Sequence, residues 1–123
     1  MGVFYVSCEI VNTRHPNRTA TVSKLLVDSG SEFTWIPATT LQQAGIQIAK
    51  KDQAFQMANG TIITRSVGYA IVRGAGFETV DEVVFAQPGD LAPLGSRTLE
   101  GFGAVVDARR KRLVAAGPVP AAP

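Results

Sequence analysis

Short runs rich in Val, Ile, Thr and aromatic residues alternate with clusters of Gly, Pro, Asn and Asp along most of the chain. Such runs, bounded by turn-forming residues, are typical of β-strands. We expect strands over residues 2–11, 18–27, 67–73 and 77–86, with extended chain resuming between 46 and 55. Turns are expected at 12–17, 74–76 and 88–90. The pattern predicts an all-β fold that opens with a hairpin ending at residue 28.

One segment between these strands has helical character. Residues 37–44 begin with a proline, which the first turn of a helix tolerates. Leu41 and Ala44 can both face inward, and Gly45 is placed to end the helix. We therefore expect one or two helical turns there.

Residues 56–63 contain the pair Asn59-Gly60 between two β-prone arms. Asn-Gly is the strongest short-range signal for a β-hairpin, because both central residues of a type I′ turn need a positive φ. We expect a hairpin with such a turn at its tip.

The end of the chain divides into two parts. Residues 104–114 are predicted to close the sheet as a hairpin or paired strand, whereas 116–123 contain only Ala, Gly, Pro and Val, with three prolines. Prolines at that density cannot join a central strand. We expect one domain over residues 1–115, followed at 116–123 by a disordered tail or linker.

Composition supports a single folded domain without a strong electrostatic partner. The chain has 123 residues, 46% of them hydrophobic, and a formal net charge of +2. This charge is too small to indicate nucleic acid or a membrane surface. The basic run 109–112 lies between two predicted strands, where a solvated hairpin tip explains it. We expect no nucleic-acid partner.

The sequence contains one cysteine, Cys8, and one histidine, His15. A single cysteine forms no internal disulfide, and no paired Cys/His spacing indicates a zinc site. His15 lies in a predicted turn without a recognisable nucleophile beside it, so a Ser-His-Asp or Cys-His mechanism has no support. We expect no metal and no organic cofactor.

No targeting segment is recognisable. The apolar opening of the chain is short, lacks a basic leader and carries Glu9. No stretch approaches the roughly 20 apolar residues of a membrane helix. We expect no membrane contact within this chain and a cytoplasmic location, unless a longer product carries an anchor elsewhere.

The tetrapeptide Val27-Asp28-Ser29-Gly30 ends the second predicted strand. Asp-Ser-Gly alone is equally typical of a turn, in which Asp bonds the backbone and Gly supplies a positive φ. A second segment, which begins near Leu94-Gly95 about sixty residues later, changes that balance. The two segments, with the intervening hairpin, resemble those of the retropepsin-like (clan AA) aspartic proteases, particularly the small single-lobed bacterial members.

This resemblance implies a fold and a reaction. The fold would be a closed or partly open retropepsin-like barrel with one or two short helices, of which the second follows Gly95. We expect Ser96 to cap that helix and Gly101 or Gly103 to end it. The reaction would be hydrolysis of peptide bonds by a water held between two aspartates that share one proton. Only Asp28 carries the motif, so the partner aspartate would come from a second copy in a homodimer.

The resemblance also implies roles for individual residues. Asp28 would be catalytic, with Ser29, Gly30 and Ser31 supporting its loop. Ser29 would bond across the dimer axis. Leu94 and Gly95 would lie under the loop as a structural motif. The residues expected to bind the peptide substrate are Glu32, Trp35, Ala58, Asn59 and Gly60, the last three in a flap.

The chain departs from the viral members of this family at one position. Those members commonly place an arginine directly after the hydrophobic-Gly pair and join it to an acid in the active-site loop. Here that position is Ser96, and Arg97 follows one residue later. Whether Arg97 reaches Glu32 is open at this point.

Two other functions fit parts of the sequence. The same fold without turnover would be a peptide-binding or dimerisation module, and a monomeric chain would favour it because one carboxylate cannot act as both acid and base. A small β-barrel using residues 109–112 to bind nucleic acid would show steeply salt-dependent binding. The complete Asp-Ser-Gly motif favours the protease.

Overall fold

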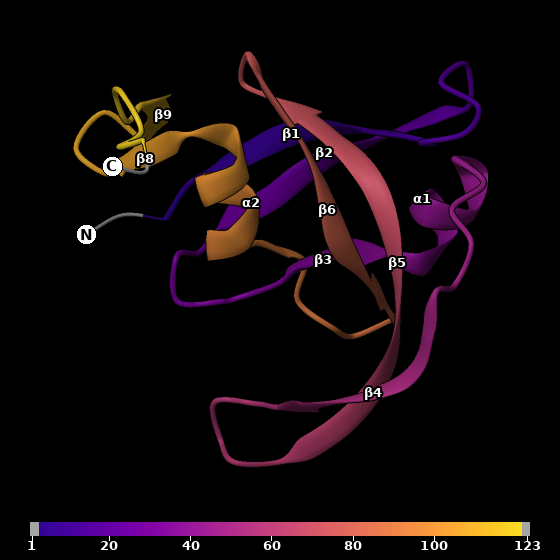
Figure 1. Cartoon of the computed structure of the whole chain (residues 1–123). Coiled ribbons are helices and arrows are strands. Elements are labelled where there is room, and N and C mark those ends of the chain that lie inside the picture. Colours follow the sequence, from indigo (N-terminus) through magenta and orange to yellow (C-terminus); the bar gives the residue numbers. More distant parts are fainter. Residues whose placement is uncertain (1–2, 122–123) are drawn as a thin grey trace.

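A computed structural model describes residues 3–121 (Figure 1). That range is mostly β with two short helices, as the sequence predicts. In chain order the elements are β1 (Tyr5–Val11), β2 (Thr19–Val27), β3 (Thr34–Pro37), α1 (Ala38–Gln43), β4 (Lys50–Gln56), β5 (Ile62–Gly74), β6 (Phe77–Ala86), β7 (Pro93–Leu94), α2 (Ser96–Phe102), β8 (Ala104–Asp107) and β9 (Arg112–Ala115).

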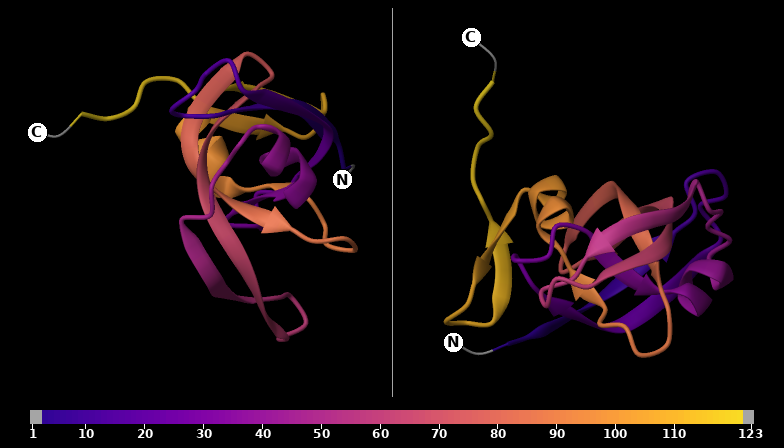
Figure 2. Two further views of the ribbon diagram at one scale, coloured as in Figure 1. Left: turned by 90° about the vertical axis from the view of Figure 1, so that its right-hand side faces the viewer. Right: turned by 90° about the horizontal axis from the view of Figure 1, so that it is seen from below.

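Seven strands form one mixed sheet in the order β3-β6-β5-β1-β2-β7, with β4 paired to β5 off this path. The pairs β2–β7 and β3–β6 are parallel, and the others are antiparallel. The first part of β5 pairs with β4, and the later part lies between β1 and β6. As a result β4 and the start of β5 project from the body as a long hairpin (Figures 1 and 2).

A closed or partly open barrel was expected, and no closed barrel is found within residues 3–121, because β3 and β7 at the two ends of the sheet do not pair with each other. β7 has only two residues, and Gly95 and α2 follow it at once. The chain therefore leaves the sheet before a ladder to β3 can form.

The main hydrophobic core lies between the curled sheet and the two helices. Along β2 the buried residues alternate with exposed ones, as expected for a strand with one face in the core. Ile10, Leu25, Ile36, Leu41 and Leu94 are all fully buried. A second, smaller cluster is formed by Trp35, Val67, Val84 and Ala86, with Phe33, Phe55 and Ile63 packed against it.

Several local predictions are confirmed. β1 and β2 form the expected antiparallel hairpin, and residues 88–90 form a turn in which the Asp90 N–H donates to the Gln87 carbonyl. Leu41 of α1 and Ala44, which follows the helix, both face inward and are fully buried. Gly45 ends that segment with a φ of 71°.

The turn at the tip of the β4–β5 hairpin differs from the prediction. Gly60 has a φ of 87°, but Asn59 is not among the positive-φ residues, so the type I′ assignment is wrong. The Gly60 N–H donates to the Met57 carbonyl, and Met57 N–H donates to the Thr61 carbonyl. This is a three-residue loop with glycine in the left-handed region. The Asn59 side chain accepts the Thr61 N–H, which holds the loop in that form.

The type I′ geometry occurs instead between β5 and β6. Gly74 pairs with Phe77, which leaves two central residues, Ala75 (φ 52°) and Gly76 (φ 85°). A positive φ is strained for alanine, and the residue preferences of turns do not predict an alanine at this position.

Two predictions near the end of the chain are wrong. Ser96 is the first residue of α2, the N-cap position belongs to Gly95, and no side chain caps the helix. Gly103 does end it, in the left-handed conformation (φ 65°). Residues 104–114 do form the predicted hairpin, with β8 paired to β9, but this hairpin is a separate two-stranded sheet and does not close the main one.

Residues 116–121 contain neither helix nor strand and are exposed, running away from the body in both views of Figure 2. Their assignment to a disordered tail stays a prediction, as does the domain limit at 115. Positions 1–2 and 122–123 of the predicted ranges lie outside the described residues. Within residues 3–121, no helix is long and apolar enough to cross a membrane.

The strained turn gives a stability prediction. Ala75→Gly is expected to raise the free energy of unfolding by roughly 0.5 kcal/mol, because about 1–2 kcal/mol of strain is relieved against the roughly 0.5–1 kcal/mol that glycine costs in conformational entropy. Ala54→Gly, at an exposed position in β4, is the control and should lower it by about 0.5–1 kcal/mol. Urea denaturation measures both. Equal destabilisation by the two substitutions would contradict the assignment.

Candidate active site

Asp28 follows β2 directly, in a tight turn held by backbone hydrogen bonds. Its N–H donates to the Leu94 carbonyl at 3.1 Å, and its own carbonyl accepts the Ser31 N–H at 3.1 Å. Its carboxylate Oδ1 accepts the Gly30 N–H at 3.0 Å. Residues 28–30 are nevertheless exposed. The carboxylate is thus fixed by its own loop and accessible from outside the chain.

The loop is anchored by a close crossing of two backbones at Gly95. The Ser96 N–H donates to the Ser31 carbonyl at 2.7 Å, and the Arg97 N–H donates to the Glu32 carbonyl at 3.1 Å. A Cβ at Gly95 would overlap the Phe33 carbonyl and lie 2.8 Å from the Ser31 oxygen. Only glycine allows the loop and the start of α2 to approach this closely.

A buried chain of hydroxyl groups continues from this crossing. The Gly95 N–H donates to Thr34 Oγ1 at 2.9 Å, and Thr34 Oγ1 lies 2.6 Å from Thr98 Oγ1. Thr98 donates its own proton to Asp81 Oδ2 at 2.8 Å, so Thr34 must donate to Thr98. Both threonines are fully buried. Because the Asp81 carboxylate can only accept, the direction of each hydrogen bond along this chain is fixed.

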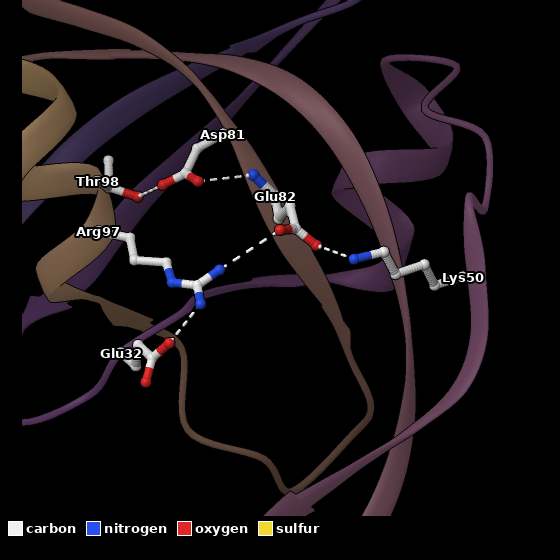
Figure 3. Close-up of polar contacts among 6 residues, drawn as sticks. All are labelled: Glu32, Lys50, Asp81, Glu82, Arg97 and Thr98. Carbon is white, nitrogen blue, oxygen red and sulfur yellow. Dashed lines mark hydrogen bonds and ion pairs between the residues drawn. The ribbon is translucent and has the colours of Figure 1, made fainter.

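A charged cluster lies beside this hydroxyl chain (Figure 3). Arg97 pairs with Glu32 of the loop at 2.5 Å and with Glu82 of β6 at 3.4 Å. Glu82 also accepts a hydrogen bond from Lys50 of β4 at 2.8 Å, which raises the pKa of Lys50. The Arg97 guanidinium lies 4.3 Å from the centre of the Phe33 ring. Arg97 therefore does reach Glu32, in spite of its displaced position in the sequence.

The β4–β5 hairpin packs on the loop through aromatic side chains. Phe55 lies 5.2 Å from Trp35 and 5.4 Å from Phe33, measured between ring centres. Trp35 is only 7% exposed, so it forms part of this cluster rather than an open wall. The tip, Ala58 to Gly60, is exposed and makes no hydrogen bond to residues 28–32 among those described.

An ion pair supports the base of the same hairpin. Arg65 of β5 donates to both carboxylate oxygens of Asp90, each at 2.7 Å. The hydrogen bond from Arg65 is the main reason that the pKa of Asp90 lies below its usual value, and the Gln87 N–H contributes as well. This pair connects β5 to the turn that follows β6.

The residues expected around Asp28 are therefore partly assembled in one chain. Ser29, Gly30, Ser31, Glu32, Leu94 and Gly95 lie together, whereas Ala58, Asn59 and Gly60 lie at the separate tip. Sequence reasoning missed Thr34, Thr98, Asp81, Glu82 and Lys50. The one available signal was the acidic pair Asp81-Glu82 inside an otherwise β-prone strand.

Other chemistry has little support. Cys8 is buried, and burial raises the pKa of its thiol to about 11, so it is a poor nucleophile. Within residues 3–121, no group of three His, Cys, Asp or Glu side chains is placed to hold a metal ion.

Comparison with known proteins points to one family. A family model described as "Aspartyl protease" matches residues 17–98, well over half of the chain. The matched region includes the Asp28 loop, the β4–β5 hairpin and the crossing at Gly95. Searches of curated proteins and of solved structures found no match.

The crossing at Gly95 gives a second prediction. Gly95→Ala is expected to lower the free energy of unfolding by roughly 2–3 kcal/mol, because the new Cβ would overlap backbone rather than a movable side chain. Ser96→Ala is the matched control, since the Ser96 side chain makes no hydrogen bond within the described chain, and it should change stability by no more than about 0.5 kcal/mol. Chemical denaturation of both variants tests this; similar stabilities would contradict it.

The hydroxyl chain gives a third prediction. Thr98→Val should cost about 1–3 kcal/mol, because it leaves Thr34 and the Asp81 carboxylate without their shared partner. The double variant with Thr34→Val should cost less than the sum of the two single changes. Thr64→Val, at an exposed position of β5, is the control and should be nearly neutral. Strict additivity in this double-mutant cycle would contradict a connected chain.

Proposed function

This chain belongs to the aspartyl protease family, of the retropepsin type, and from that premise we propose that it is a homodimeric aspartic endopeptidase. Each subunit contributes Asp28, and the two carboxylates hold the water that attacks the peptide bond. No metal or organic cofactor takes part.

The observation that carries this proposal is the isolation of Asp28. Its carboxylate is exposed, fixed by the Gly30 N–H and accompanied in its loop by only one other acid, Glu32, which pairs with Arg97. Acid and base catalysis at one water needs two carboxylates. A two-fold axis passing beside the loop supplies the second one from an identical chain.

Two aspartates placed this way would share one proton, since like charges at such a separation do not both ionise near neutral pH. The ionised carboxylate takes a proton from the water as the oxygen attacks the carbonyl carbon. The protonated carboxyl group donates to the carbonyl oxygen. The carboxyl group that took the proton from water then donates it to the amide nitrogen, while the other carboxylate takes a proton back from a hydroxyl of the tetrahedral intermediate. The C–N bond breaks, the two peptides are released, and the pair again holds one proton.

The loop residues have distinct parts in this proposal. The Ser29 hydroxyl makes no hydrogen bond within the described chain and is exposed, so it is free to bond across the dimer axis. Ser31 donates to the Phe33 carbonyl at 2.9 Å and stiffens its own loop. Gly30 leaves space for the Asp28 carboxylate, because a Cβ there would lie only 3.2 Å from Asp28 Oδ1.

Apolar surface beside the loop supports association of two chains. Ser29 lies at the edge of a hollow of about 290 Å³, lined mainly by α2 and β8 and including Leu99 and Val105. Val105 is 48% exposed, and Tyr5, whose strand partner is Leu26, is 54% exposed. Burial of such side chains against a second copy is favourable. In the dimer, the two open sheets would together complete the retropepsin-like architecture.

The substrate would be an extended peptide lying between the Asp28 loops and the two flaps. Ala58, Asn59 and Gly60 offer main-chain groups from the flap tip, and Glu32 offers a carboxylate from the loop. Trp35 would contribute indirectly: its ring packs on Phe55 of β4 and so supports the base of the flap.

The experiment is cleavage of a diverse peptide mixture, followed by mass spectrometry between about pH 3 and 8. Asp28→Asn should lower cleavage by more than about 10³-fold while the fold is retained, because the amide cannot act as the base. Asp52→Asn is the control: it removes the same charge at an exposed, positive-φ position of β4 and should leave cleavage unchanged.

Cleavage by Asp28→Asn at the wild-type rate would overturn the mechanism. Absence of cleavage by both proteins, together with a monomeric wild type at micromolar concentration, would favour a peptide-binding module without turnover.

A further inference from the structure

A second polar groove lies at the opposite end of β2 from Asp28. It is formed by the β1–β2 turn, by residues 45–49 after α1, and by Tyr69 of β5, and its volume is about 440 Å³. β2 has nine residues, which separates the two ends by roughly 30 Å. The turn and α1 lie together in Figure 1, far from β8 and β9. The groove is therefore separate from the Asp28 loop, although Tyr69 pairs across the sheet with Glu82 of the charged cluster.

The floor of this groove is held in one conformation by Asn12, which is 7% exposed. Its Nδ2 donates to the carbonyls of Ala44 and Gly45, each at 3.0 Å. Its Oδ1 accepts the N–H groups of Arg14 at 2.9 Å and His15 at 3.0 Å. One buried side chain thus joins the turn to the end of α1. A rigid floor lowers the entropic cost of binding a ligand.

One wall is basic and has no internal counter-charge. Within residues 3–121 the side chains of Arg14, His15 and Arg18 make no hydrogen bond or ion pair, and none of the lining residues is acidic. The Arg18 guanidinium lies against Gly45, where any Cβ would overlap it. Five other arginines in the described chain pair with acids, namely Arg65, Arg73, Arg97, Arg110 and Arg112. Arg109, at the exposed β8–β9 tip, also has no such partner within the described chain. The groove differs from that tip because two unpaired guanidinium groups lie there beside a hollow.

The other wall is apolar. Ile48 and Tyr69 line the groove and are 50% and 49% exposed, although both are large apolar side chains. A bare inorganic anion would leave this wall unused. A ligand that carries an anionic group beside an apolar one would contact both walls.

We propose that this groove binds an acidic peptide segment, with a carboxylate between Arg14 and Arg18 and a neighbouring apolar side chain against Ile48 and Tyr69. Arginine suits this role because its planar guanidinium donates two parallel hydrogen bonds to a carboxylate. The proposal does not depend on the proteolytic site, since the groove shares no residue with it.

Titration of the ¹⁵N-labelled full chain, observed by NMR, tests this proposal. The probe is a capped hexapeptide of alternating Glu and Leu, and the Asp28→Asn background prevents its cleavage. The amide signals of residues 12–15, 17–18 and 45–49 should shift, and binding should weaken with added salt. The matched Gln-Leu peptide should bind at least tenfold more weakly.

The charge contribution is tested with Arg14→Gln/Arg18→Gln, which should weaken binding of the acidic peptide at least tenfold. Arg109→Gln/Lys111→Gln is the control: it also removes two positive charges, from the exposed turn between β8 and β9, and should change the dissociation constant less than twofold. The amide spectra of both variants establish that they are folded.

The apolar wall is tested with Ile48→Thr, which should weaken binding several-fold.

Equal weakening by both charge variants would overturn the proposal, as would equal binding of the Gln-Leu peptide. Tighter binding of inorganic phosphate or of an oligothymidylate at the same residues would also overturn it, because the ligand would then not be an acidic peptide.

Discussion

The close crossing of two backbones at Gly95 is the constraint on which the rest of the site depends. Without a side chain at that position, the start of α2 lies directly on the loop that carries Asp28, and two of its N–H groups bond the carbonyls of Ser31 and Glu32. The same crossing ends β7 after two residues, which leaves the sheet open. One missing Cβ therefore fixes the Asp28 loop and also limits how far the sheet can close.

From this crossing, two sets of contacts extend to β6, and one of them continues to the projecting hairpin. The hydroxyl chain through Thr34 and Thr98 reaches Asp81 of β6, and Arg97 reaches Glu82, the next residue of the same strand. Glu82 in turn holds Lys50, at the start of β4 (Figure 3). The loop, α2, β6 and the hairpin are thus joined through neighbouring acids. Partly exposed ion pairs add little stability individually, so their contribution here is mainly to set the relative position of these elements.

The features that sequence reasoning predicted are those decided by neighbouring residues. The β1–β2 hairpin, the helix before Gly45 and the end of α2 at Gly103 all follow from local turn and breaker chemistry. The features that it missed depend on contacts between distant residues. Thr34 and Thr98 are 64 residues apart and have no common pattern. The β8–β9 hairpin was predicted, but its separation from the main sheet depends on long-range packing that local patterns do not specify. The predicted turn type at Asn59-Gly60 was wrong. Only Gly60 has a positive φ, and the Asn59 side chain accepts the Thr61 N–H in a three-residue loop.

The central claim is that one active site requires Asp28 from two chains, and subunit mixing tests it most directly. Wild-type and Asp28→Asn chains would be co-refolded in varying proportions at constant total concentration, and peptide cleavage would be measured. If every site needs two aspartates, activity falls with the square of the wild-type fraction, to about one quarter in an equal mixture. A linear fall, to about one half, would mean that each chain acts alone and would contradict the account.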